Sequence, residues 1–144
     1  MKKLCRRLVI LLLVYSTVCM SALYSRAAEE SERKWTSCMR DRDTGVEYFY
    51  DKETLMKPSK ELIQVWRRRV FPTGAAQKEI VTLDEIDCRK ARYRALELRV
   101  TYWDGTTKTY DKVGPWVTVY ENSVEEFLMD EHCRETTNAE NGKQ

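Results

Sequence analysis

The sequence predicts an α+β fold, in which a small antiparallel β-sheet of about five to six strands is followed by a C-terminal helix. From Trp35 onward, short stretches that alternate polar and apolar residues are separated by turn-forming residues, which is typical of an antiparallel sheet. The dipeptide "DG" at Asp104 and Gly105 lies between two extended stretches and strongly indicates a hairpin. The segment "ENSVEEFLMDEHC" carries a helix-start signal, so the chain is expected to close with a helix.

The first part of the domain predicts three strands. Residues 35–40 alternate so that Trp35 and Met39 share one face, whereas Cys38 is expected on the polar, solvent-facing side. The turn residues of 41–45 lead into a second alternating stretch at 46–51, which predicts a hairpin. After a short extended piece around "TLMK", residues 61–71 are rich in strand-forming types and predict a third strand.

Residues 80–111 form the longest extended stretch of the chain. Its apolar residues change parity between Cys88 and Tyr93, so we expect a β-bulge or a break in the strand between them. The "DG" turn then predicts that the last part of this stretch folds back as a hairpin.

The final helix is expected to begin at Ser123. Ser123 and Glu126 form a capping box, in which each side chain accepts a hydrogen bond from a free backbone N–H. Val124, Phe127 and Leu128 make an apolar stripe, and Cys133 falls well away from it at 100° per residue. Either the last turn is distorted or the buried face is broad.

The first 27 residues have the layout of a secretory signal peptide. Basic residues precede an uncharged apolar run at 8–18, and a small-residue site predicts cleavage after Ala27. The alternative is an uncleaved anchor, but the apolar run from Leu8 to Leu23 is shorter than the roughly 20 residues of a spanning helix. We therefore expect a signal peptide at 1–27, one domain at 28–134, a disordered tail at 135–144 and no stable membrane span after cleavage.

Charge argues against binding to nucleic acid. Cleavage after Ala27 removes five of the 25 basic residues and none of the 23 acidic residues, so the net charge changes from +2 to −3. The positive charge of the whole chain therefore belongs to its leader, whereas a nucleic-acid footprint should reside in the folded domain.

Three cysteines follow the expected cleavage site: Cys38, Cys88 and Cys133. Compartments outside the cytoplasmic membrane are usually oxidising, so an odd count predicts one disulfide and one leftover cysteine. The sequence has a single histidine, His132, and no CxxC motif, so a zinc site would lack ligands. We expect neither a metal nor a cofactor.

Several residues together resemble the surface-adhesin protein E family. The resemblance covers about residues 35–133 and rests on the order and spacing of Trp35, "YFYD" at 48–51, "VW" at 65–66, "DC" at 87–88, "YR" at 93–94, "PW" at 115–116 and a helix ending in Cys133. It implies an antiparallel sheet with the helix packed on it, a disulfide between Cys88 and Cys133, and no catalysis. Cys38 is an additional cysteine outside the family pair, so we expect it to be a free thiol.

The resemblance also implies a Gram-negative envelope protein, in the periplasm or on the outer surface, with adhesion to host matrix and serum proteins and a tendency to dimerise. The leader lacks a usable lipobox before Cys19, which leaves surface anchoring without support from the sequence. The exposed edges of a small sheet also favour a weak or moderate homodimer.

Two groups of basic residues are candidates for binding an acidic ligand. Arg67 and Arg69 share one face of a strand, with Arg68 on the other, and a solvated strand whose charges protect an edge is favoured over ligand binding. Lys90 and Arg92 are the second pair. Acidic residues lie close to them in sequence, so a charge-balanced strand is the favoured interpretation and ligand binding is the alternative.

Enzyme chemistry finds little support, because the only histidine is expected at the end of a helix beside a disulfide. A non-catalytic exported binding module, with a protein ligand at the cell surface or in the periplasm, is the favoured function. The alternatives are a periplasmic structural or housekeeping protein and a small inhibitor of an incoming hydrolase.

Overall fold

The computed structural model describes residues 33–133. The expected signal peptide at 1–27 and the expected tail at 135–144 lie outside the described residues. Residues 34–133 belong to one compact unit.

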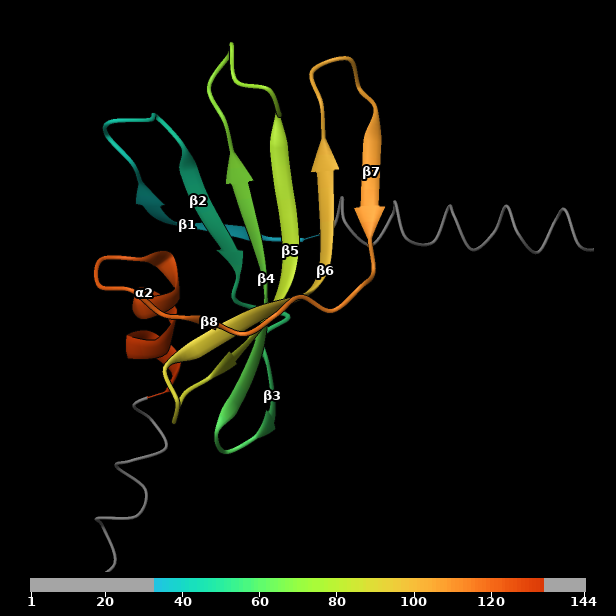
Figure 1. Cartoon of the computed structure of the whole chain (residues 1–144). Coiled ribbons are helices and arrows are strands. Elements are labelled where there is room, and N and C mark those ends of the chain that lie inside the picture. Colours follow the sequence, from blue (N-terminus) through green and yellow to red (C-terminus); the bar gives the residue numbers. More distant parts are fainter. Residues whose placement is uncertain (1–32, 134–144) are drawn as a thin grey trace, which may run out of the picture. The chain divides into compact units, whose positions relative to one another are not determined.

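The described residues form an eight-stranded antiparallel sheet and one helix (Figure 1). The elements are β1 (Trp35–Arg40), β2 (Glu47–Asp51), β3 (Met56–Ser59), β4 (Leu62–Val70), β5 (Glu79–Asp87), β6 (Arg92–Thr101), β7 (Thr107–Tyr110), β8 (Val117–Thr118) and α2 (Val124–His132). The antiparallel sheet and the C-terminal helix are confirmed, but the expected count of five to six strands is too low. β3 contains Pro58 and β8 has two residues, so neither is long enough to show an alternating pattern.

Two long strands, β4 and β6, each pair with three neighbouring strands. The main path of the sheet runs β1-β2-β4-β5-β6-β7. The second half of β4 pairs with β2 and its first half with β3, so two short strands share one edge of β4. In the same way β6 pairs with β7 at Leu98–Thr101 and with β8 at Arg92 and Tyr93. Figure 1 shows the β4–β5 and β6–β7 loops side by side at one end of the sheet.

The core lies between one sheet face and α2. Tyr50, Ile63, Val65 and Ile86 pack with Val124 and Leu128 of the helix, and each is less than one-tenth exposed. The predicted cap is confirmed, because Ser123 Oγ accepts a hydrogen bond from Glu126 N and Glu126 Oε2 accepts one from Asn122 N. The sheet and helix thus come together as a two-layer domain.

The buried face of α2 is broader than the predicted stripe. Val124, Leu128 and His132 are buried, and Met129 packs against them, whereas Phe127 is 37% exposed. A face of this width reaches round to Cys133, which caps the helix in an ordinary αR conformation. The broad face, rather than a distorted last turn, therefore brings Cys133 to the sheet.

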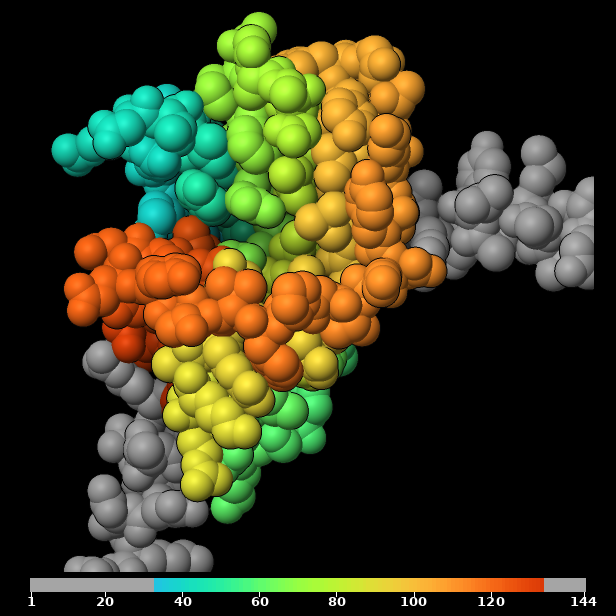
Figure 2. Space-filling model, viewed as in Figure 1, coloured from blue at the N-terminus to red at the C-terminus, as the bar shows by residue number. Residues whose placement is uncertain are grey.

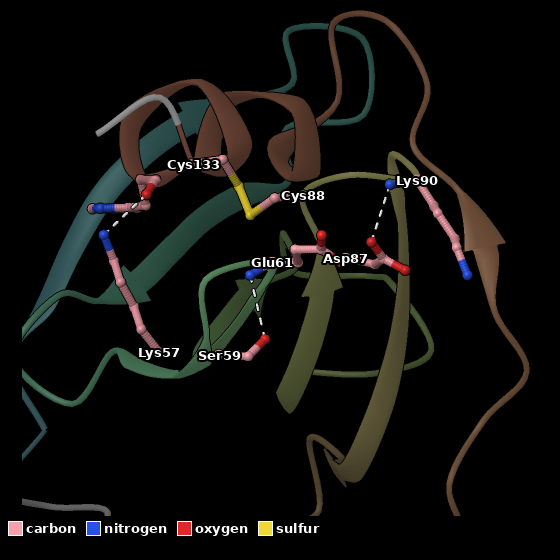
Figure 3. Close-up of a disulfide and its surroundings, with 8 residues drawn as sticks. Lys57, Ser59, Glu61, Asp87, Cys88, Lys90 and Cys133 are labelled. Carbon is pink, nitrogen blue, oxygen red and sulfur yellow. Dashed lines mark hydrogen bonds between the residues drawn. A yellow bond between two sulfur atoms is a disulfide. The ribbon is translucent and has the colours of Figure 1, made fainter. Parts of the chain in front are cut away.

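The predicted break between Cys88 and Tyr93 is a tight turn that separates β5 from β6. Ala91 has a positive φ of 46°, and Asp87 Oδ1 accepts a hydrogen bond from Lys90 N at 3.0 Å. Cys88 lies in this turn and is joined to Cys133, which closes a 45-residue loop (Figure 3). The disulfide that the family resemblance implies thus fastens the end of α2 to the β5–β6 turn.

Cys38 is a free cysteine, but its expected solvent-facing position is wrong. The register of β1 shifts between Ser37 and Met39, so a β-bulge at Cys38 breaks the alternation on which the expectation depended. The Cys38 side chain packs against the core, and its Sγ donates to Tyr48 O at 3.3 Å. Burial raises the pKa of the Cys38 thiol, so it is protonated at neutral pH.

Candidate functional site

Arg67 belongs to the interior of the domain. It is 7% exposed, and its guanidinium donates to Asp84 on β5 and to Glu125 in the first turn of α2. The expectation of a solvated strand is therefore wrong for this residue. Arg67 thus links β4 to β5 and to the start of α2, which is a structural role.

Burial and ion pairing together shift the pKa values of Arg67, Asp84 and Glu125. Burial acts to lower the pKa of Arg67, but its two carboxylate partners outweigh burial and raise it. Burial acts to raise the pKa of Glu125, and Arg67 outweighs that effect and lowers it. The pKa of the more deeply buried Asp84 is raised by burial despite its contact with Arg67.

Arg69 lines a cavity of about 400 Å³ at the N-terminus of α2. The cavity walls come from the β1–β2 hairpin, β4 and the helix start, and comprise Met39, Asp41, Tyr48, Arg67, Arg69, Asn122, Ser123, Val124 and Glu125. Figure 2 shows a hollow between the β1–β2 segment and the helix. Arg69 makes no ion pair within residues 33–133, so of the two arginines it is the one with a guanidinium open to a ligand.

Lys90 and Arg92 lie on a different part of the molecule. Lys90 is exposed in the β5–β6 turn (Figure 3), and Arg92 donates to Asp87 Oδ2 at 3.1 Å. Strand register places Asp87 and the Arg67 side chain on opposite faces of the sheet. The two predicted pairs of basic residues therefore do not form one site.

The expected charge-balanced strand describes the second pair well. Arg94 donates to Glu85 Oε1 at 2.6 Å, beside the Arg92–Asp87 pair. The guanidinium carbons of Arg92 and Arg94 lie 4.4 and 4.5 Å from the ring centroid of Trp116. Arg92 and Arg94 are thus held by carboxylates and by the ring of Trp116, which favours a role in stabilising the sheet over a role in binding a ligand.

The structure also shows exposed apolar side chains around the β6–β7 hairpin, a candidate binding surface that the sequence analysis did not identify. Trp103, Tyr110 and Val113 are 46%, 50% and 50% exposed, and all lie in or beside the β6–β7 hairpin. Trp103 Nε1 donates to Ala75 O at 3.0 Å, which ties the two neighbouring hairpin loops together. Beside Trp103 is an open cavity of about 380 Å³ that Tyr102 and Lys108 also line. We call Trp103, Lys108, Tyr110 and Val113 the β7 surface.

The β7 surface has the composition of an interaction site. Large half-exposed apolar side chains in and beside one hairpin favour binding to another molecule, and Trp and Tyr contribute most at protein interfaces. A tryptophan placed next to the "DG" turn was the available sequence signal, because a hairpin tip offers little core in which to bury it.

The model of the surface-adhesin protein E family matches residues 35–134, which include every described strand and the helix. The chain belongs to the surface-adhesin protein E family. Comparisons with curated proteins and with solved structures find no match. Family membership indicates an adhesin-like protein that is exported or at the surface. Within residues 33–133, no helix is long and apolar enough to cross a membrane.

Proposed function

We propose that this adhesin E family member is a non-catalytic envelope protein that binds extracellular host or matrix proteins. The observation that carries the proposal is the β7 surface, where Trp103, Tyr110 and Val113 are each about half exposed. Adhesins bind other molecules through exposed surface, and Trp and Tyr anchors of this kind supply much of the energy of protein interfaces.

Binding to a panel of matrix and serum proteins tests the proposal. Immobilised exported protein is expected to bind at least one purified member of the panel, and Trp103→Ala or Tyr110→Ala is expected to weaken binding about tenfold or more. Tyr120→Ala is the matched control, because Tyr120 is an exposed aromatic residue (68%) outside the β7 surface. The proposal fails if no panel protein binds, or if Tyr120→Ala weakens binding as much as Trp103→Ala.

Cell fractionation separates the surface role from its alternatives. A protein that appears only after the periplasm is opened is a periplasmic structural protein rather than an adhesin. Tight one-to-one binding to a hydrolase would instead identify an inhibitor. The intact mass of the exported chain, expected to begin at Ala28, reports on the signal peptide in the same samples.

Arg69 is a second proposed contact for an acidic ligand. It is the cation of the β4 pair whose guanidinium has no ion-pair partner within the described residues. Arg69→Ala should weaken binding to an acidic panel member without changing the melting temperature. An unchanged affinity would leave the cavity without a role in binding.

A further inference from the structure

The main path of the sheet ends in two strands, β1 and β7. β1 is interrupted by the bulge at Cys38, and bulges bend an edge strand and hinder pairing with another chain. β7 pairs with β6 over four residues in unbroken register, and all four of its residues are exposed. Of the two end strands, β7 is therefore the regular and accessible one.

The hydrogen bonds of the β6–β7 hairpin show which backbone groups of β7 face outward. Tyr102 N donates to Thr106 O, whereas Thr101 O accepts from Lys78 N on the other side of β6. Thr101 and its partner Thr107 are therefore a non-hydrogen-bonded pair. Because such pairs alternate along an antiparallel ladder, the N–H and C=O groups of Thr107 and Thr109 point away from β6.

The side chains of β7 determine which residues of a partner strand would pair favourably with it. Lys108 is the one charged residue among the four, and it lies on the same face as Tyr110. A second copy of β7 would form the most outward hydrogen bonds when Thr107 pairs with Thr109. That register places Lys108 directly opposite Lys108 of the other copy, and like charges in that position are destabilising. A segment with an acidic residue opposite Lys108 fits better.

We propose that an extended segment of a partner protein adds to the sheet as a strand along β7, with an acidic side chain facing Lys108 and an apolar side chain facing Tyr110. The backbone groups of Thr107 and Thr109 supply the pairing, and the side chains supply selectivity, as in other cases of β-strand addition. This inference rests on the proposed protein-binding function and gives its mode and partner chemistry.

Thr109→Pro is the decisive variant. Proline removes the outward N–H of residue 109, and an edge strand tolerates proline where that N–H faces solvent, so the domain should still fold. Thr109→Ala is the matched control because it changes the side chain and keeps the N–H. The probe is a short synthetic peptide in which Thr alternates with Val and the central Val is replaced by Glu. We expect Thr109→Pro to weaken its binding at least about tenfold, with Thr109→Ala close to wild type.

A charge exchange tests the selectivity. Lys108→Glu should bind the Glu peptide more weakly and bind the same peptide with a central Lys more tightly than wild type does. Folding of each variant is checked by its melting temperature. Equal binding by wild type and Thr109→Pro, or no binding of the Glu peptide by wild type, would overturn the inference. A wild-type dimer that Thr109→Pro abolishes, together with no peptide binding, would identify a second copy as the occupant instead.

The two proposals can fail separately. If panel binding depends on Trp103 and is indifferent to Thr109→Pro, the protein-binding function stands and strand addition is wrong. If no panel protein binds while the Glu peptide binds in a manner that Thr109→Pro abolishes, the edge is a binding strand and the proposed extracellular partners are wrong.

Discussion

Arg67→Met should destabilise the domain strongly. The substitution keeps a long, unbranched side chain on β4 but removes the cation that contacts both Asp84, which is 1% exposed, and Glu125. Removing one partner of a buried ion pair costs about 3–5 kcal/mol, because the remaining charge stays buried without compensation. Out of a total stability of roughly 5–15 kcal/mol, that is a large share.

The assay is thermal and urea unfolding of the variant beside Arg69→Met. A domain of this size loses about 4–8 °C of melting temperature per kcal/mol, so the expected decrease is on the order of 15 °C or more. Arg69 lies two residues along the same strand and makes no ion pair within residues 33–133, so Arg69→Met should cost less than about 0.5 kcal/mol. Equal stability of the two variants would refute the argument that Arg67 is a buried structural cation.

The loss should also depend on pH. Without the guanidinium, the folded-state pKa of Asp84 rises further above its value in the unfolded chain, since burial already raises it. A carboxyl group with a raised folded pKa stabilises the folded state at pH values below its unfolded pKa, and that contribution is lost as pH rises. Arg67→Met should therefore differ less from wild type near pH 4 than at pH 7. An equal deficit at both values would show that Asp84 does not take up a proton.

Two further predictions concern the disulfide and the second face of the sheet. Cys133→Ser removes the disulfide that closes the 45-residue loop and should lower the free energy of unfolding by about 4 kcal/mol. Cys38→Ser, at the free cysteine, should cost less than about 1 kcal/mol. Equal losses of the two variants in urea unfolding would contradict this prediction. Burial acts to raise the pKa of Glu85, but hydrogen bonds from Gln64 and Arg94 outweigh the effect of burial, so that the pKa is lowered. The stability that Glu85 adds is therefore present above its unfolded pKa and is lost as pH falls through its folded pKa. Glu85→Gln should therefore weaken the fall in stability toward acid pH. An unchanged acid dependence would count against the pairing of Glu85 with Gln64 and Arg94.

Local patterns predicted the elements well. The strands at 35–40 and 47–51, the "DG" turn and the Ser123–Glu126 box each depend on residues close in sequence, and each is found in the structure. The bulge at Cys38 was missed because alternation by itself does not show where one extra residue is inserted. The predicted stripe on α2 included Phe127, although the residue that completes the buried face is His132.

The roles of the arginines could not be predicted from the sequence. The carboxylates that engage Arg67 lie 17 and 58 residues away in the chain, so its burial depends on tertiary packing. By contrast, Arg92 and Arg94 pair with carboxylates five and nine residues away across one hairpin, and the sequence did predict a charge-balanced strand there. Aromatic residues are ambiguous in the same way, because a pattern assigns Tyr110 a face without showing whether anything covers that face.

Hydrogen exchange of the exported protein, with and without a bound matrix protein from the panel, shows which surface binds. We expect slower amide exchange at residues 102–113 on binding, with the largest change at the outward amides of Thr107 and Thr109. Exchange at the cavity wall formed by Asn122 to Glu125 should change much less. Protection confined to that cavity or to the β5–β6 turn, with exchange along β7 unchanged, would contradict the assignment of the β7 surface as the binding site.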